Sequence, residues 1–351
     1  MNTAITTKLI IEKKDFHQIR FDSIQALRGI AALFVVLEHI RFLNCGAFGV
    51  DIFFCISGFM MMLSTHKDTT HFLTRRLIRV VPLYYIMTLG TFALLLLFPG
   101  MFAQTKADPV FLIKSLLFIP FDIGGGVLQP LMRIGWTLNC EVFFYLLFFI
   151  ALRISHKYRG LICSGLILVP VAAARLTGTG FAPLSFYGDP VMLEFILGIL
   201  VYYAARSIYE RFSAGRLPRL WLPVCLLTAL ACFICLIATK PFLNILGFRR
   251  PLLWGIPAAG IVLCVFTAGL LLKAPEALVR LGNASFSLYF MHYYPIMLLD
   301  RKIFDFGSLT ARSLAGAVLG IAVSAVLALI CHSLIEKRLT GWLRKFFKFL
   351  S

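Results

Sequence analysis

The amino-acid sequence predicts an all-α fold, a polytopic bundle of membrane-spanning helices, and three observations carry this prediction. Hydrophobic residues make up 60% of the 351 residues and charged residues only 14%, which is more apolar surface than a soluble domain can bury. Apolar runs of roughly 18 or more residues recur along the whole chain, as in transmembrane helices. The strict alternation of polar and apolar residues that a membrane β-barrel needs is absent from the sequence.

The long apolar segments of the chain are the predicted spans, about ten transmembrane helices. They cover approximately residues 24–43, 47–64, 78–98, 136–152, 160–175, 184–205, 219–238, 252–272, 283–299 and 312–335. A further apolar run, 110–120, is shorter and contains Lys114. At a rise of about 1.5 Å per residue, this run is too short to cross a hydrocarbon core roughly 30 Å thick.

The distribution of positive charge indicates the orientation of the spans. If 110–120 does not cross and the N-terminus is cytoplasmic, most lysine and arginine residues fall on the cytoplasmic side, as the positive-inside rule favours. If 110–120 did cross, every later loop would change sides and the bias would largely cancel. The sequence therefore predicts ten spans, cytoplasmic N- and C-termini, and a short re-entrant or interfacial segment at 110–120.

These spans divide the chain into three regions. Residues 1–23 form a cytoplasmic N-terminal segment, 24–335 the transmembrane domain, and 336–351 a basic amphipathic tail on the inner leaflet. The first apolar run has no small-residue cleavage site after it, so we expect a mature helix and no removed signal peptide. The tryptophans fall at predicted span ends, as in an aromatic belt: Trp136, Trp221, Trp254 and Trp342.

The net charge of +18 would suggest a nucleic-acid partner in a soluble protein. Here the basic residues flank the spans, so membrane topology and anionic lipid account for them, and no nucleic-acid partner is expected. The nine cysteines are scattered, and Cys232 and Cys235 lie inside an apolar run, where packing is the simpler interpretation. We find no metal-ligand spacing and expect no metal site.

The segment "LRGIAALFVVLEHI", residues 27–40, carries ionisable groups inside a predicted span. Such a charge costs at least about 2.5–3.5 kcal/mol at mid-bilayer, so each group is a functional candidate. Arg28 and His39 are eleven residues apart, which places them on one helix face about 16 Å apart, with His39 in the outer half. The alternative is that Arg28 snorkels to the inner headgroups and His39 only packs.

Three carboxylates are expected at the depth of His39. Asp51 opens the second predicted span, Glu141 opens the fourth, and Glu194 lies at similar depth on the sixth. A carboxylate beside an imidazole raises its basicity and fixes its tautomer, which suits a general base. The alternative is a buried polar network that only holds helices together.

At the cytoplasmic face, Arg76 and Arg79 lie at i, i+3 on one helix face, at a depth near that of Arg28. Guanidinium groups bind phosphate oxygens bidentately, so this cluster suits a cytoplasmic, phosphate-rich cofactor with a long arm. Plain positive-inside topology is the alternative.

Seven segments in order give the chain a family resemblance. They are "IQALRGIAALFVVLEH", "GVDIFFCISGFMM", "RRLIRVVPLYY", "WTLNCEVFFY" beginning at Trp136, "EFILGIL", "LGNASFSLYFMHY" and "LIEKRL". The chain resembles acyltransferase family 3, the membrane O-acyltransferases, and looks most like bacterial exopolysaccharide O-acetyltransferases. Thr137 stands where the family usually has serine, and Glu336 is followed by Lys337 where the late motif often has Glu-x-Pro.

The resemblance implies acetyl-CoA as co-substrate, with no tightly bound cofactor, and a sugar or polysaccharide hydroxyl as acceptor in the bacterial inner (cytoplasmic) membrane. It implies that His39 is the catalytic histidine and Glu141 a functional carboxylate. It also implies that three arginines bind the donor: Arg28, Arg76 and Arg79. His292 matches a family histidine, although packing is an equally simple interpretation.

The expected reaction is proton abstraction from a sugar hydroxyl by His39, with Glu141 or Asp51 stabilising the imidazolium. Direct transfer and an acetyl-histidine route both stay open. The alternative function is a transporter or flippase for a lipid-linked saccharide or proton-coupled solute, because buried histidines and carboxylates also make proton relays. The acceptor sugar, the acyl chain and the oligomeric state are left open.

Overall fold

The computed structural model confirms an all-α protein. It describes residues 15–18, 21–66, 69–99, 107–178, 180–216, 218, 220–242 and 249–349. Across these residues every regular element is helical, and the one β-type pairing is an isolated bridge between Asp122 and Leu128. Seven helical stretches are long and apolar enough to cross a membrane. The chain is therefore a multi-pass membrane protein, while the count of ten spans and the cytoplasmic termini stay predictions.

The described helices group into two compact units built from interleaved parts of the chain. The first unit comprises residues 1–67 and 193–329, and the second comprises residues 68–192 and 330–351. The sequence did not predict this division, because long apolar segments occur in both units.

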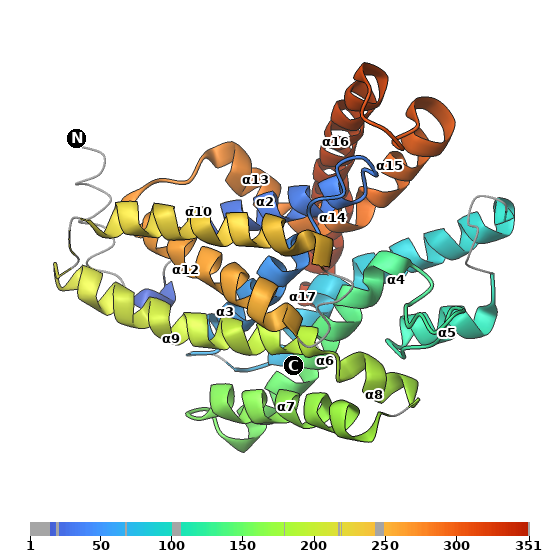
Figure 1. Ribbon diagram of the computed structural model, residues 1–351. Coiled ribbons are helices and arrows are strands. Elements are labelled where there is room, and N and C mark those ends of the chain that lie inside the picture. Colours follow the sequence, from blue (N-terminus) through green and yellow to red (C-terminus); the bar gives the residue numbers. More distant parts are fainter. Residues whose placement is uncertain are drawn as a thin grey trace. The chain divides into compact units, whose positions relative to one another are not determined.

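The first unit contains most of the long helices. They are α2 (Asp22–Glu38), α3 (Gly49–Ser64), α9 (Leu193–Ser213), α10 (Trp221–Thr239), α12 (Ile256–Leu271), α13 (Glu276–Asn283), α14 (Ser285–Met291), α15 (Tyr293–Leu299) and α16 (Ala311–Cys331, whose last two residues belong to the second unit). Short 3₁₀ and π turns join them: η1 (Phe16–Gln18), η5 (Lys240–Phe242), η7 (Pro251–Gly255) and η8 (Asp300–Phe304). Figure 1 shows α9, α10 and α12 running side by side.

Glycine allows a close helix contact between α3 and α9 in the first unit. α3 and α9 cross at Gly58 and Gly198, where a Cβ on Gly198 would lie 2.1 Å from the Cys55 carbonyl oxygen. Only glycine allows two backbones to approach so closely, and such contacts are how apolar helices associate without a hydrophobic driving force. This crossing holds Asp51 on α3 and Glu194 on α9 in neighbouring helices.

Two predicted spans of the first unit differ from the structure. α2 has 17 residues, about 26 Å, and ends at Glu38 instead of continuing to residue 43. The predicted span 283–299 is broken at Ala284 and His292 into the end of α13, α14 and α15. Hydropathy predicts neither the early end of α2 nor the breaks at Ala284 and His292, because most residues beyond them are still apolar.

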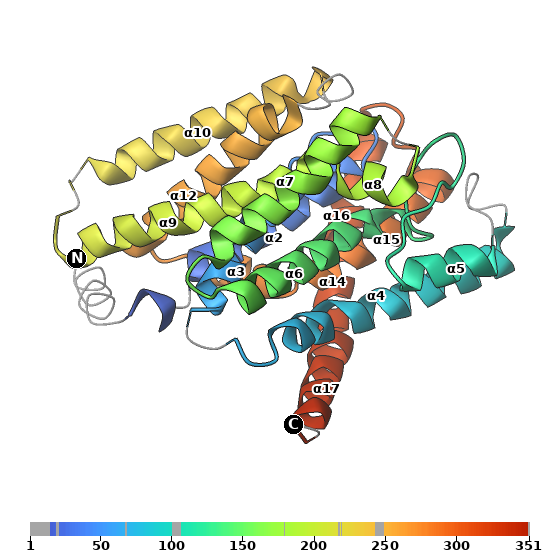
Figure 2. The ribbon, with the colours of Figure 1, turned by 90° about the horizontal axis from the view of Figure 1, so that it is seen from below.

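The second unit contains α4 (Phe72–Leu97), α5 (Pro109–Leu116), α6 (Trp136–Ile154), α7 (Arg159–Thr177), α8 (Ala182–Tyr187) and α17 (Lys337–Phe349). Its short turns are η3 (Arg133–Gly135), η4 (Pro190–Met192) and η9 (His332–Glu336). α6 packs against both α4 and α7, and α5 lies along α4 (Figure 2).

α5 corresponds to the predicted short segment 110–120. It has eight residues, about 12 Å, which is too short to cross a membrane. The hydroxyls of Tyr84 and Tyr85, at the middle of α4, donate to the carbonyls of Ser115 (3.0 Å) and Leu116 (2.9 Å) at its C-terminal end. A helix end in an apolar environment needs such donors, because no water is present to satisfy its last carbonyls.

The C-terminal tail continues the last long helix. α16, η9 and α17 follow one another without a non-helical break, so residues 311–347 form a single helical stretch. The predicted boundary at residues 335–336 falls inside the π turn η9, where His332 Nδ1 lies 3.0 Å from Glu336.

Trp254 departs from the predicted aromatic belt. Its side chain is fully buried, and its Nε1 donates to the Thr239 hydroxyl at 2.9 Å. Trp342 on α17, by contrast, is 61% exposed. Position at the end of a span is therefore not enough to place a tryptophan at the membrane interface.

Candidate functional site

Two histidines, His39 and His292, are in contact at the end of α2. His39 is the C-cap of this helix, and its Nδ1 lies 2.9 Å from the Val35 carbonyl oxygen and 3.2 Å from Nε2 of His292. His292 is fully buried at the break between α14 and α15, with its Nδ1 3.1 Å from the Leu288 carbonyl oxygen. The fold thus brings together two residues that are 253 positions apart.

These contacts fix the tautomer of each ring. A carbonyl oxygen can only accept a hydrogen bond, so we assign the proton of each neutral ring to Nδ1. His292 Nε2 then carries a lone pair and accepts the Nδ1–H of His39, which the Val35 carbonyl shares. In neutral His39 the remaining lone pair is on Nε2, which is the nitrogen able to take a proton.

The carboxylate of Glu38, just before His39, binds the loop that follows and also pairs with a lysine. Glu38 accepts hydrogen bonds from the backbone N–H groups of Gly46 (2.8 Å) and Ala47 (3.0 Å) and from Lys240 Nζ (2.8 Å). Burial raises the pKa of the neighbouring Cys45 thiol, which Lys240 only partly offsets. A thiol with a raised pKa is a poor nucleophile at neutral pH, so Cys45 is no candidate for covalent catalysis.

A second anchor ties this loop to the segment after α15. Arg41 donates from Nε and Nη2 to both carboxylate oxygens of Asp300, at 2.9 and 2.8 Å, and from Nη2 to Asp305 at 2.6 Å. Such bidentate bonds fix the orientation of both partners. The loop that leaves His39 is therefore fixed against the end of the helix pair that carries His292.

Asp51 and Glu194 gather around an arginine that the sequence analysis did not single out. Arg250 donates from Nε and Nη2 to the two oxygens of buried Asp51, each at 3.1 Å, and its Nε lies 3.9 Å from Glu194. Its guanidinium carbon is 5.5 Å from the centre of the Trp254 ring. The sequence predicted both carboxylates at the depth of His39, and their described ion pairs are with one guanidinium.

The sequence gives no separate reason to select Arg250, which lies just before a predicted span. The dipeptide Arg249–Arg250 stands before Pro251 at that position, where topology alone accounts for it. The signal in the sequence was that Asp51 and Glu194 both lie inside apolar runs, because a pair of carboxylates there requires a cation nearby.

The second unit holds a separate charged cluster on α4 and α6. The Tyr145 hydroxyl donates to Glu141, one turn earlier on α6. Arg76 on α4 lies within electrostatic range of Glu141, Tyr145 and Arg79, and its guanidinium carbon is 5.9 Å from the centre of the Phe72 ring. The sequence analysis put Glu141 and the arginines at different depths, whereas the structure brings them into one cluster.

Two further candidates have simpler placements. Arg28 is half-buried on α2, eleven residues before His39 in the same helix. Trp136 is the first residue of α6 and follows the 3₁₀ turn η3. Among the residues that the structure describes, no group of three or more His, Cys, Asp or Glu side chains could hold a metal ion.

Comparison with known proteins identifies the family of the region that carries these residues. The family model described as an acyltransferase domain matches residues 21–332 of the chain, a range that includes every candidate named above. No solved structure gives a significant match.

Several curated proteins are similar to this chain. The exopolysaccharide production protein ExoZ of Rhizobium meliloti (strain 1021) is 32% identical over 302 residues, covering 80% of this chain and 88% of that protein. The putative membrane-bound transacylase BcsY of Komagataeibacter xylinus is 25% identical, covering 94% of this chain and 86% of that protein. The putative peptidoglycan O-acetyltransferase YrhL of Bacillus subtilis (strain 168) is 26% identical, and the chain spans 55% of its length.

The ion pairs of Arg250 are expected to contribute to the stability of the protein. Arg250→Ala leaves the buried carboxylates of Asp51 and Glu194 without their cation, so the free energy of unfolding should fall by up to about 3 kcal/mol. Thermal unfolding of the detergent-solubilised protein measures this loss. Arg280→Ala, which removes only an exposed i, i+4 pair with Glu276, is the matched control and should leave the melting temperature nearly unchanged. Equal melting temperatures for the two variants would contradict the assignment.

Proposed function

This chain belongs to the acyltransferase family, and on that premise we propose that it is a membrane O-acyltransferase. It transfers an acetyl group from cytoplasmic acetyl-CoA to a hydroxyl of a cell-surface or exopolysaccharide sugar, or of its lipid-linked precursor. The printed names of the relatives support this choice, since they include an exopolysaccharide production protein and a putative O-acetyltransferase. The proposed location is the bacterial inner membrane.

The contact between His39 and His292 is the observation that supports the proposed mechanism, in which His39 is the general base. His39 Nε2 takes the proton of the acceptor hydroxyl as that oxygen attacks the thioester carbonyl carbon. The C–S bond then breaks, the acetyl group stays on the sugar oxygen, and the imidazolium returns the proton to the CoA sulfur. General base catalysis of this kind contributes roughly 10²–10⁴-fold.

His292 acts in this proposal as a positioning residue. When Nε2 of His39 takes the proton, the Nδ1–H keeps its two acceptors, the Val35 carbonyl at 2.9 Å and His292 Nε2 at 3.2 Å. These acceptors hold the ring orientation and stabilise the positive charge, the part that the sequence analysis gave to Glu141 or Asp51. In the proposal Asp51 and Glu194 instead hold Arg250.

The donor is proposed to bind through the arginines. Arg76 and Arg79 place two guanidinium groups near one carboxylate, Glu141, which leaves the cluster positive and suited to the phosphates of CoA. The bond from Tyr145 to Glu141 holds that carboxylate in place. Arg28, on the helix that carries His39, is proposed as a further donor-binding residue.

The first test removes the base. His39→Ala should lower CoA release from acetyl-CoA by about 10²–10⁴-fold, because the proton transfer is lost. CoA release by the membrane-embedded protein measures this directly, and His71→Ala, at an exposed position, is the control. Undiminished release in His39→Ala would contradict the proposal. Solute or lipid-linked saccharide transport without CoA release would favour the transporter or flippase instead.

The second test separates positioning from structure at His292. His292→Phe should lower kcat with little change in KM for acetyl-CoA, because the Nδ1–H of His39 loses an acceptor. His292→Gln should recover much of the kcat, since its amide oxygen can accept from His39 and its amide N–H can donate to Leu288. Steady-state kinetics and thermal unfolding of both variants measure this. Equal kcat values for the two variants, at equal stability, would remove the positioning role.

The third test concerns the donor site. Arg76→Ala should raise the KM for acetyl-CoA more than it lowers kcat, because a phosphate contact acts alike on bound substrate and transition state. Arg153→Ala, an exposed arginine at the end of α6, is the control and should leave the KM unchanged. An unchanged KM in Arg76→Ala would count against phosphate binding at this cluster.

A further inference from the structure

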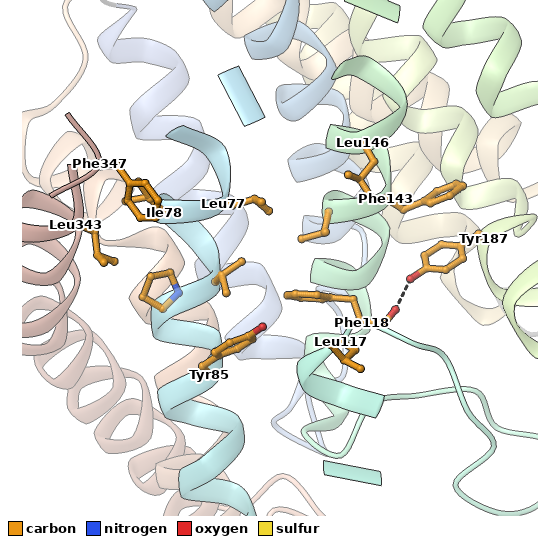
Figure 3. Close-up of a pocket in the computed structure, with 13 residues that line it drawn as sticks. Leu77, Ile78, Tyr85, Leu117, Phe118, Phe143, Leu146, Tyr187, Leu343 and Phe347 are labelled. Atoms are coloured by element: carbon orange, nitrogen blue, oxygen red, sulfur yellow. Dashed lines mark hydrogen bonds between the residues drawn. The ribbon is translucent and has the colours of Figure 1, made fainter. Parts of the chain in front are cut away.

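The second unit contains an apolar cavity of about 540 Å³. One wall is α4, which contributes Leu77 and Tyr85, and the opposite wall is α6, which contributes Phe143 and Leu146 (Figure 3). A third side is the short segment after α5, which contributes Leu117 and Phe118. The catalytic proposal makes no use of this space.

The described lining of the cavity is mostly apolar. It contains no charged side chain, and both of its side-chain hydroxyls already donate to backbone carbonyls. Tyr85 donates to the Leu116 carbonyl at 2.9 Å, and Tyr187 donates to the Phe118 carbonyl at 2.6 Å, the bond drawn in Figure 3. Burying an unpaired amide or hydroxyl there would be costly, so a hydrocarbon chain fits better than a sugar or a pantetheine arm.

The rim of the cavity is apolar and exposed. Leu117, Leu146 and Phe347 are 61%, 41% and 43% exposed. From Leu77 to Tyr85, α4 rises about 12 Å, which is close to half of a hydrocarbon core roughly 30 Å thick. An opening of this kind on a membrane-crossing helix admits a chain from one leaflet.

The remaining wall supplies the charge. Leu343 and Phe347, one turn apart on α17, line the cavity, and α17 packs against α4 in the same unit. Between them in the sequence stand Arg344 and Lys345, both exposed. Basic residues near a membrane surface attract anionic headgroups electrostatically.

We propose that this cavity binds one acyl chain of an anionic glycerophospholipid, with the headgroup beside Arg344 and Lys345. The apolar lining selects the chain and the basic face of α17 selects the headgroup charge. A zwitterionic phospholipid fills the cavity equally well but lacks the second interaction. The site fixes the C-terminal helix to the membrane leaflet that supplies the lipid.

Photolabelling of the full chain tests the proposal. The protein is reconstituted in phosphatidylcholine vesicles containing phosphatidylglycerol that carries a diazirine in one acyl chain. Label should concentrate on peptides that contain residues 77–85, 142–146 and 343–347, and unlabelled phosphatidylglycerol should compete better than unlabelled phosphatidylcholine. α10, most of whose surface is exposed and apolar, is the internal reference. Equal labelling of α10 and the cavity peptides would overturn the proposal.

Two sets of variants sharpen the result. Val81→Trp fills the cavity and should reduce label on the 343–347 peptide several-fold, while Leu89→Trp, at an exposed position of α4 outside the cavity, should not. Arg344→Glu with Lys345→Glu should abolish the preference for phosphatidylglycerol and keep the labelling by phosphatidylcholine. Unchanged label in Val81→Trp would overturn the proposal. Protection of these peptides by acetyl-CoA would do the same, because the cavity would then belong to the donor.

Discussion

An ionisable or polar group inside an apolar helix bundle has to be balanced locally, because neither lipid nor packed hydrocarbon can solvate it. The described structure meets this constraint repeatedly with a partner from a different part of the chain. Glu38 forms an ion pair with Lys240, Asp51 forms one with Arg250, and His39 is hydrogen-bonded to His292. Each pair joins segments about 200 residues or more apart, so the pairs link distant parts of the first unit.

The same constraint shapes the short segment of the second unit. A helix that ends inside the bundle exposes carbonyls, and the tip after α5 meets three tyrosine hydroxyls, from Tyr84, Tyr85 and Tyr187. With these bonds made, the described lining of the cavity beside this segment contains no charged side chain. The mostly apolar cavity is therefore compatible with the polar backbone of the segment.

Hydropathy predicted the all-α membrane fold because span composition is a local property of the sequence. It did not predict the end of α2 at Glu38 or the break at His292, because both depend on hydrogen bonds to distant residues. His39 and His292 were each candidates in the sequence analysis, but their contact needs the fold. The sequence did not predict that Glu141 lies near Arg76, because this depends on how α6 packs on α4: a Cβ on Gly135 would lie 2.8 Å from the Tyr84 ring.

The central claim is that neutral His39 carries its proton on Nδ1 and its lone pair on Nε2. Nitrogen-15 NMR of histidine-labelled protein, with the His39 signals assigned by their loss in His39→Ala, measures this directly. The account predicts a protonated Nδ1 and an unprotonated Nε2 at a pH where both rings are neutral. A proton on Nε2 of His39 would contradict it, because that nitrogen could not then accept the proton of an attacking hydroxyl.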